Sequence, residues 1–328
     1  MSRRLLIVRL SAMGDIVESL GAVRALATAS PEDELVFVCQ RSFVPLLENL
    51  DYLHEVVVHD RRAGLRGYLA TCRAVREQRC DVALDLQGNW KSAGICWASR
   101  APDRIGPAGA FRRERTSGIL LNRRVSCSAP LHPARVALSV VRALAPDAED
   151  LPPCLVATAA EVAAAADGVR SLGLDPDRPF RVLVVASPRD PRSWPIDAMR
   201  REAEHSPLPC LWLAGPAEEG VSMPDGVVKL RHGADHLREL VGLGALVARS
   251  GGEVLGPDQG ATHVLAACGA RTVALFGPQD PALTAPVGAE VLGHREPPPC
   301  APCRQRECSL SEGAVCMDFD TSGARRWL

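Results

Sequence analysis

Short apolar runs alternate with segments of helical periodicity along the whole chain. In the first half, the runs that have the length of buried strands lie at residues 5–10, 35–39, 55–58 and 82–85. Between the first two of these, one face of a predicted helix is formed by Ile16, Leu20, Val23 and Leu26. Alternation of buried strands with helices is typical of a parallel sheet covered on both faces, so the pattern predicts an α/β fold.

A proline-rich segment divides this pattern into two halves. Between Ala145 and Phe180 the chain holds five prolines around an alanine-rich helix that begins near Ala159, as in a connection between domains. After it the alternation restarts, with predicted strands at residues 181–186, 210–214, 227–230, 245–248 and 272–276. We therefore expect two facing Rossmann-like domains, residues 1–155 and 156–328, with a central cleft at the carboxyl ends of their sheets.

Composition narrows the class of protein. The chain has 328 residues, enough for two hydrophobic cores, and its formal net charge of -1 points away from a nucleic-acid partner. The apolar start is interrupted by Arg9, too early for a signal peptide, and no apolar stretch approaches the roughly 18 to 20 residues that span a bilayer. Twelve cysteines without a secretory signal indicate reduced thiols. We expect a cytoplasmic protein with peripheral membrane contact at most.

The first loop, Ser-Ala-Met-Gly-Asp at residues 11–15, lies where the first predicted strand ends and a helix begins. Backbone N–H groups at a helix start, together with Gly14, allow close approach of a ligand. The carboxylate of Asp15 would repel a phosphate, but it suits a base that takes a proton from an attacking hydroxyl. Spacing alone leaves open a second interpretation, in which Asp15 merely caps the helix.

Four sequence blocks resemble those of the ADP-heptose:lipopolysaccharide heptosyltransferases, glycosyltransferase family 9. In chain order they read LLIVRLSAMGDI at 5–16, DLQGNWKS at 85–92, DQGATH at 258–263 and TVALFGPQDP at 272–281. The resemblance implies a GT-B fold whose N-terminal domain binds the acceptor and whose C-terminal domain binds ADP-heptose. It also implies inverting transfer that needs no metal, with Asp15 as the general base.

Candidates for donor binding lie in the second half of the chain. After two of its strands, a cation or the N–H groups of a helix start could stabilise the charge on the departing ADP. The expected donor-binding residues are Ser187, Arg189, Arg192, Glu218, Asp258, Gln259, Gly260 and His263. Pro188, Arg192 and Gln259 depart from the family, which usually has a hydroxyl, a lysine and Thr or Ser at these positions. A proline-rich surface loop, a capped turn and a solvated glutamate are the plainer alternatives.

Candidates for acceptor binding lie in the first half. The family's acceptors carry carboxylates and phosphates, which arginine pairs bind well. The expected acceptor-binding residues are Ser11, Met13, Gly14, Lys91, Arg112 and Arg113. Arg115 belongs to the same basic group, and Arg61 and Arg62 are weaker candidates. The basic run at 111–115 is equally typical of an exposed surface without a ligand.

The last cysteines form a separate motif. Cys300 and Cys303 have metal-ligand spacing, and Cys308 and Cys316 follow at a spacing outside the usual zinc-ribbon pattern. Four thiolates could hold a structural Zn or Fe ion, whereas free thiols or a disulfide remain alternatives. We attach this tail to fold stability and not to transfer.

Two other functions stay open at this point. A GT-B-shaped epimerase or hydrolase of nucleotide sugars would need no basic acceptor surface. A non-catalytic nucleotide- or metal-binding homologue would fit the altered residues Pro188 and Gln259. An NAD-dependent dehydrogenase is disfavoured, because neither half contains G-x-G-x-x-G followed by an acidic residue about twenty positions on.

Overall fold

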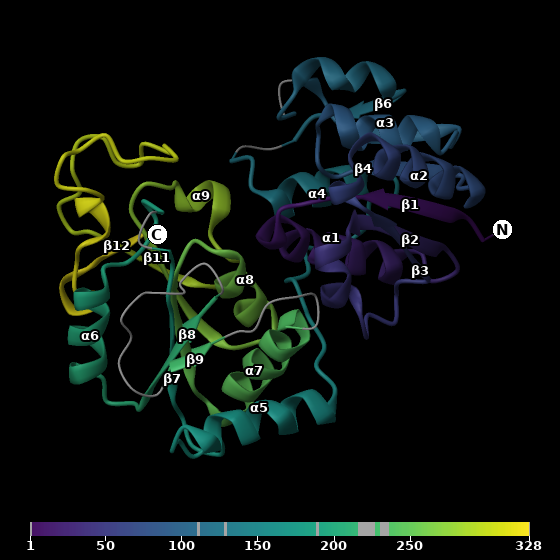
Figure 1. Ribbon diagram of the computed structural model, residues 1–328. Coiled ribbons are helices and arrows are strands. Elements are labelled where there is room, and N and C mark those ends of the chain that lie inside the picture. Colours follow the sequence, from purple (N-terminus) through teal and green to yellow (C-terminus); the bar gives the residue numbers. More distant parts are fainter. Residues whose placement is uncertain are drawn as a thin grey trace. The chain divides into compact units, whose positions relative to one another are not determined.

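The computed structural model describes residues 2–109, 112–127, 130–187, 190–215, 227–229 and 236–327. The chain forms two compact units, Met1–Cys154 and Leu155–Leu328. Each unit holds a sheet that is wholly or mainly parallel, with helices packed on it, so the predicted α/β fold is confirmed (Figure 1). Within the described ranges, no helix combines the length and the apolar character needed to cross a bilayer.

The sheet of the first unit is parallel throughout and has the order β3-β2-β1-β4-β5-β6. Its strands are β1 (Arg4–Val8), β2 (Glu34–Gln40), β3 (Glu55–His59), β4 (Val82–Asp85), β5 (Asp103–Pro107) and β6 (Arg123–Val125). The first four match the predicted strands. The last two were missed because β5 ends in Gly106 and Pro107, residues typical of turns, and β6 begins with two exposed arginines.

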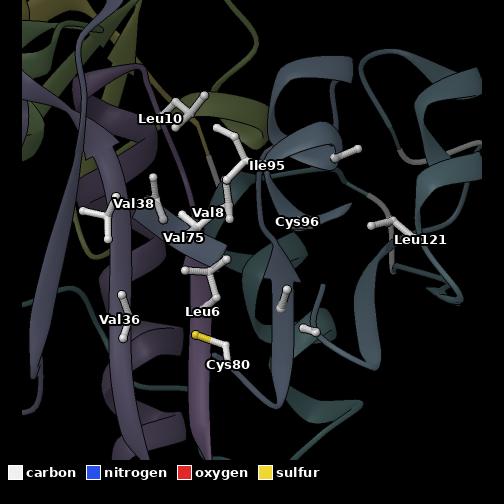
Figure 2. Close-up of a cluster of buried hydrophobic side chains, with 14 residues drawn as sticks. Leu6, Val8, Leu10, Val36, Val38, Val75, Cys80, Ile95, Cys96 and Leu121 are labelled. Carbon is white, nitrogen blue, oxygen red and sulfur yellow. The ribbon is translucent and has the colours of Figure 1, made fainter. Parts of the chain in front are cut away.

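Helices cover both faces of this sheet. They are α1 (Met13–Ala29), α2 (Gly64–Glu77), α3 (Trp90–Ala98) and α4 (Pro133–Arg142), with short 3-10 turns η1 (Arg41–Leu47), η2 (Arg61–Ala63) and η4 (Arg115–Leu120). The predicted face of α1 is buried, and α1 packs against α4. On the other face, Leu6 and Val8 of β1 pack with Val75 of α2 and Ile95 of α3 (Figure 2).

The second unit repeats the same topology with one addition. Its sheet has the order β13-β12-β11-β10-β7-β8-β9, and β13 alone among these strands runs antiparallel, on β12. The strands are β7 (Arg181–Val184), β8 (Cys210–Ala214), β9 (Val227–Lys229), β10 (Glu253–Pro257), β11 (Arg271–Phe276), β12 (Glu290–Gly293) and β13 (Arg325–Trp327). Residue 230, the last of a predicted strand, lies outside the described residues.

Helices and the C-terminal tail both pack against the sheet of the second unit. The helices are α5 (Ala159–Ser171), α6 (Ile196–His205), α7 (His236–Ser250), α8 (Gly260–Ala267) and α9 (Pro281–Thr284), with η6 (Val315–Met317) and η7 (Thr321–Gly323). Trp194, just before α6, is buried and donates from Nε1 to the carbonyl of Phe319 at 3.0 Å. Cys316 and Met317 belong to the same apolar cluster. The tail therefore stabilises this unit by covering one face of its sheet.

One predicted strand was wrong. Residues 245–248 lie inside α7, whose apolar positions between Leu240 and Val247 are buried at helical spacing against α5 and α8. A short apolar run cannot distinguish a strand from a buried helix. The true strand, β10, follows immediately, and its ending in Gly256 and Pro257 hid it.

Candidate functional site

The loops that follow β1 and β4 lie together in the first unit. β1 pairs with β2 on one side and β4 on the other, so the strand order reverses between β1 and β4. In open parallel sheets, ligands bind outside the carboxyl ends of the strands at such a reversal. Two contacts join the loops there: the Leu10 amide donates to Gln87 Oε1 at 2.7 Å, and the Arg9 guanidinium donates to the Leu86 carbonyl.

Asp15 is held at this position by two groups. It is the third residue of α1, and its Oδ2 accepts from the Ala12 amide at 3.3 Å, so the capping interpretation is partly correct. The same Oδ2 lies 2.6 Å from Nη2 of Arg9. Both contacts engage one oxygen, and 37% of the side chain stays exposed, so the carboxylate keeps a side open to an incoming hydroxyl.

Arg9 is a site residue that the sequence analysis missed. It is 6% exposed, and it links the carboxylate of Asp15 to the loop after β4. The available signal was a charged residue directly after a run of four buried apolar positions, where an unpaired guanidinium would be costly. Ser11, Met13 and Gly14, the other predicted residues of this loop, are half-buried beside Asp15.

The loop after β4 is shaped by a second carboxylate. Asp85 Oδ1 accepts from the amides of Gln87 at 3.1 Å and Gly88 at 2.9 Å. Gly88 has φ +75°, a conformation that favours glycine, and the turn brings Asn89 to the N-cap of α3. Lys91 follows in the first turn of α3 with an exposed side chain. The turn therefore leads directly into the helix start that carries Lys91.

Arg112 corrects the expectation of a direct acceptor contact. Its side chain and that of Asp85 are both 0% exposed, and Nη2 lies 2.6 Å from Asp85 Oδ2. Nε of the same guanidinium donates to Ser117 Oγ at 2.9 Å. A guanidinium in this position holds the loop and does not reach solvent, whereas its neighbour Arg113 is exposed. Asp85, its partner, was not among the predicted site residues.

The strand order of the second unit reverses between β7 and β10, and the loops after these strands are also joined. Nη1 of Arg192, in the loop after β7, donates to the carbonyl of Asp258, directly after β10, at 2.8 Å. Ser187 lies half-buried at the start of the first loop. Two of the predicted donor segments therefore meet at the carboxyl edge of this sheet.

Arg192 is also paired with a residue that the sequence analysis did not consider. Its guanidinium donates to both oxygens of Asp190, from Nε at 3.0 Å and from Nη2 at 2.7 Å. Burial acts to raise the pKa of Asp190, but the hydrogen bonds from Arg192 outweigh it and hold that pKa below its ordinary value. The same hydrogen bonds raise the pKa of Arg192. Asp190 therefore offsets much of the positive charge that a diphosphate would meet.

Asp258 and His263 form the second part of this edge. Asp258 is 7% exposed; its Oδ2 accepts from Thr284 Oγ1 at 3.1 Å, and its Oδ1 lies 3.4 Å from Nε2 of the buried His263. Gln259 is the N-cap residue of α8, and Gly260 begins the helix, so the amides of that first turn lie beside Asp258. Thr284 is a further residue that the sequence analysis did not select.

Two predicted donor residues, Arg189 and Glu218, lie outside the described residues. A cavity of about 380 Å³ lies next to the loop after β7, between that loop and the C-terminal tail. Its polar lining includes the carboxyl groups of Asp190, Glu312 and Asp318. Carboxylates repel a diphosphate, and neither Ser187 nor Arg192 lines the cavity, so we do not assign it to the donor.

The C-terminal cysteines lie in the tail that packs on the second sheet. Among the residues for which positions are given, no three His, Cys, Asp or Glu side chains are grouped to hold an ion. All four thiols are free of disulfide bonds, and a structural Zn or Fe ion held by them stays a prediction. Cys316 is buried; burial first, and then the thiolates of Cys303, Cys300 and Cys308, raise its pKa to about 11. This thiol serves as an apolar core residue.

Comparisons with known proteins find related sequences and related folds. A sequence profile of glycosyltransferase family 9 (heptosyltransferase) matches residues 68–313. The lipopolysaccharide core heptosyltransferase OpsX of Haemophilus influenzae is 22% identical over 296 residues, which are 87% of this chain and 82% of that protein. The region that the profile matches includes three of the four family-like sequence blocks, and the similarity to OpsX extends over most of both chains.

Solved structures share the fold. A family 9 glycosyl transferase from Veillonella parvula superposes with a TM-score of 0.74 at 17% identity, over 88% of this chain and 84% of that one. The ADP-heptose lipopolysaccharide heptosyltransferase II of E. coli superposes with a TM-score of 0.67 at 20% identity, over 88% and 90%. These likenesses confirm the GT-B fold predicted from the sequence.

Proposed function

This chain belongs to glycosyltransferase family 9 (heptosyltransferase), and we propose that it moves a heptose from ADP-heptose to a lipopolysaccharide inner-core-like acceptor, inverting the anomeric centre. The proposed donor and acceptor are those of similar proteins, the lipopolysaccharide core heptosyltransferase OpsX and the ADP-heptose lipopolysaccharide heptosyltransferase II. We assign acceptor binding to the unit Met1–Cys154 and donor binding to the unit Leu155–Leu328. The site of action is the cytoplasmic face of the membrane that carries the acceptor.

The observation that carries this proposal is the half-exposed carboxylate of Asp15 at the reversal point of the first sheet. Arg9 keeps the carboxylate in place through Oδ2, and the open side accepts the proton of an acceptor hydroxyl. As that proton moves to Asp15, the hydroxyl oxygen bonds to the anomeric carbon, and the bond to the ADP oxygen breaks. A single displacement of this kind inverts the anomeric centre. Lys91 and Arg113 are exposed cations for the carboxylates and phosphates of the acceptor.

On the donor side, we assign the diphosphate to the edge formed by Ser187, Arg192 and the first turn of α8 at Gly260. A hydroxyl, a guanidinium and helix N–H groups can stabilise the negative charge that develops on the departing ADP. The buried side chains of Asp258 and His263 lie at that first turn. We give Gln259 a contact to the donor sugar, and we retain Arg189 and Glu218 as donor contacts on sequence grounds.

The experiment that tests this function is donor turnover with and without an acceptor. We expect the purified protein to release ADP from ADP-heptose only when a heptose-deficient lipopolysaccharide is added, with little turnover of UDP- or GDP-sugars. The release is measured by a coupled assay for ADP, and the product by mass spectrometry. Release that continues undiminished without acceptor would instead assign the protein to the hydrolases of nucleotide sugars. Conversion of ADP-heptose to an isomeric ADP-sugar without release of ADP would assign it to the epimerases.

Arg192 gives a prediction specific to the donor. Removing it in Arg192→Ala is expected to weaken ADP binding roughly tenfold or more, because a charge-assisted hydrogen bond to the diphosphate is lost. Asp190→Asn is the matched variant and is expected to tighten ADP binding, because it removes a carboxylate and frees the guanidinium. Both affinities are measured by calorimetry. Equal ADP affinity in the two variants and the wild type would remove Arg192 from the donor site.

A further inference from the structure

Large apolar side chains are exposed together on one part of the first unit. Eight large hydrophobic side chains are exposed in the described part of the chain, and five of them lie on three neighbouring elements. Those five, with their exposed fractions, are Leu65 (71%) and Leu69 (57%) of α2, Trp90 (46%) and Trp97 (60%) of α3, and Ile119 (75%) of η4. We call this set the α2–α3–η4 face. Soluble monomers rarely leave such a group uncovered unless it binds something.

The three elements are in contact, and their exposed residues point away from the sheet. α3 packs against both α2 and η4, and Figure 1 shows α2 beside α3. The Tyr68 hydroxyl of α2 donates to the Lys91 carbonyl of α3 at 3.3 Å, which fixes the two helices side by side. Leu65 and Leu69 are one helical turn apart, and Trp90 and Trp97 are two turns apart, so each pair shares a side of its helix. The buried side of α2 carries Gly67, Thr71 and Val75 instead.

The same part of the chain is strongly basic. Residues 60–125 contain 14 Lys and Arg against 6 Asp and Glu, a net charge of +8 in a chain whose formal total is -1. Exposed cations around the apolar side chains are Arg61, Arg62, Arg66, Arg73, Lys91, Arg113 and Arg115. Positive charge is therefore concentrated in the segment that forms the α2–α3–η4 face, and the remainder of the chain is acidic.

We propose that the α2–α3–η4 face docks the protein on an anionic lipid bilayer. Leucine and isoleucine enter the boundary between headgroups and acyl chains, tryptophan remains at that boundary, and arginine pairs with lipid phosphates. The net charge of +8 over residues 60–125 is complementary to the negative surface of such a bilayer. The inference rests on the proposed function in one respect: docking would bring the enzyme to an acceptor that is anchored in the lipid. Lys91, which we assign to the acceptor, is one of the exposed cations of this face.

The test measures binding of the full chain to vesicles that contain no glycan acceptor. We expect the wild type to sediment with vesicles of phosphatidylglycerol and phosphatidylethanolamine and to stay in solution with phosphatidylcholine alone. The triple variant Leu65→Ser/Leu69→Ser/Trp97→Ser is expected to lose roughly tenfold or more in vesicle affinity, because its apolar surface no longer enters the bilayer. Since all three side chains are exposed, the fold should be kept, which circular dichroism checks.

The matched control is Val156→Ser/Val287→Ser, which alters two exposed apolar residues of the second unit and should bind vesicles like the wild type. A second variant, Arg62→Glu/Arg66→Glu/Arg73→Glu, should bind the anionic vesicles more weakly than the wild type. Its remaining affinity should no longer depend on salt concentration. Equal binding by the triple variant and the wild type would overturn the proposal. So would a dimer, seen by analytical ultracentrifugation, that the triple variant abolishes, because the face would then bind a second copy. Neither result depends on turnover, so failure of the proposed function would be seen separately, in the ADP-release assay.

Discussion

Replacing Asp15 by alanine is expected to lower the rate of sugar transfer at least about a hundredfold, the usual scale for loss of a general base. The acceptor hydroxyl would then have to attack without a group to receive its proton. ADP affinity should stay nearly unchanged, because we assign the nucleotide to the other unit. The rate is measured as acceptor-dependent ADP release under saturating substrates, and ADP affinity by calorimetry.

Two further variants separate the chemistry of Asp15 from its role in the loop. Asp15→Asn keeps the size of the side chain and an acceptor for the Ala12 amide, so it should lose the rate as fully as alanine does while preserving the start of α1. Asp51→Ala removes an exposed carboxylate elsewhere in the first unit and should leave the rate unchanged. Thermal unfolding of each variant is recorded alongside, because either change at Asp15 leaves the buried guanidinium of Arg9 without its ion-pair partner.

A different pattern would identify Asp15 as a structural residue. If Asp15→Ala reduced ADP affinity as much as the rate, or if Asp15→Asn retained most of the activity, the carboxylate would be only a helix cap. The hydrogen bond from the Ala12 amide already gives it part of that role. The catalytic assignment therefore depends on a rate loss that the amide variant shares and that the melting temperature does not explain.

Hydrophobic patterning predicted most of the fold because the central strands are continuous apolar runs. β4 and β8 were predicted with their observed bounds, since both are buried along most of their length. Strands at or near the sheet edges, such as β6 and β13, carry exposed arginines and have no such signature. The strand predicted at residues 245–248 was wrong for the opposite reason: a helix buried between two others is as apolar as a strand.

The candidate site was predictable only where its residues are close in sequence. The loops after β1 and β10 were found because each is a contiguous motif at a strand end. The partners of those motifs are set by tertiary structure: Asp85 lies 27 positions from Arg112, and nothing in the run at 111–115 distinguishes the buried guanidinium from its exposed neighbours. Asp190 is only two residues from Arg192, so this pairing could have been anticipated from spacing.

Removal of Arg112 should destabilise the first unit more than removal of Asp15 or of any exposed arginine. In Arg112→Leu, the carboxylate of Asp85 stays buried, with its two backbone donors but without a counter-charge. Breaking a buried ion pair from one side typically lowers the free energy of unfolding by about 3–5 kcal/mol, a large share of the stability of a domain. Urea unfolding of the first unit, followed by circular dichroism, measures the loss. The neighbouring Arg113→Leu is the matched control, with an expected change within about 0.5 kcal/mol because its side chain is exposed.

A double-mutant cycle then tests whether the ion pair itself is the cause. Asp85→Asn alone should also destabilise, because it leaves Arg112 buried without its partner. The double variant Asp85→Asn/Arg112→Leu should cost less than the sum of the two single changes, since neither charge then remains uncompensated. Strict additivity would mean that the two residues act independently. If Arg112→Leu were fully stable and instead raised the KM for acceptor, Arg112 would be assigned to acceptor binding. The ion pair between Arg112 and Asp85 would then have to open when the acceptor binds.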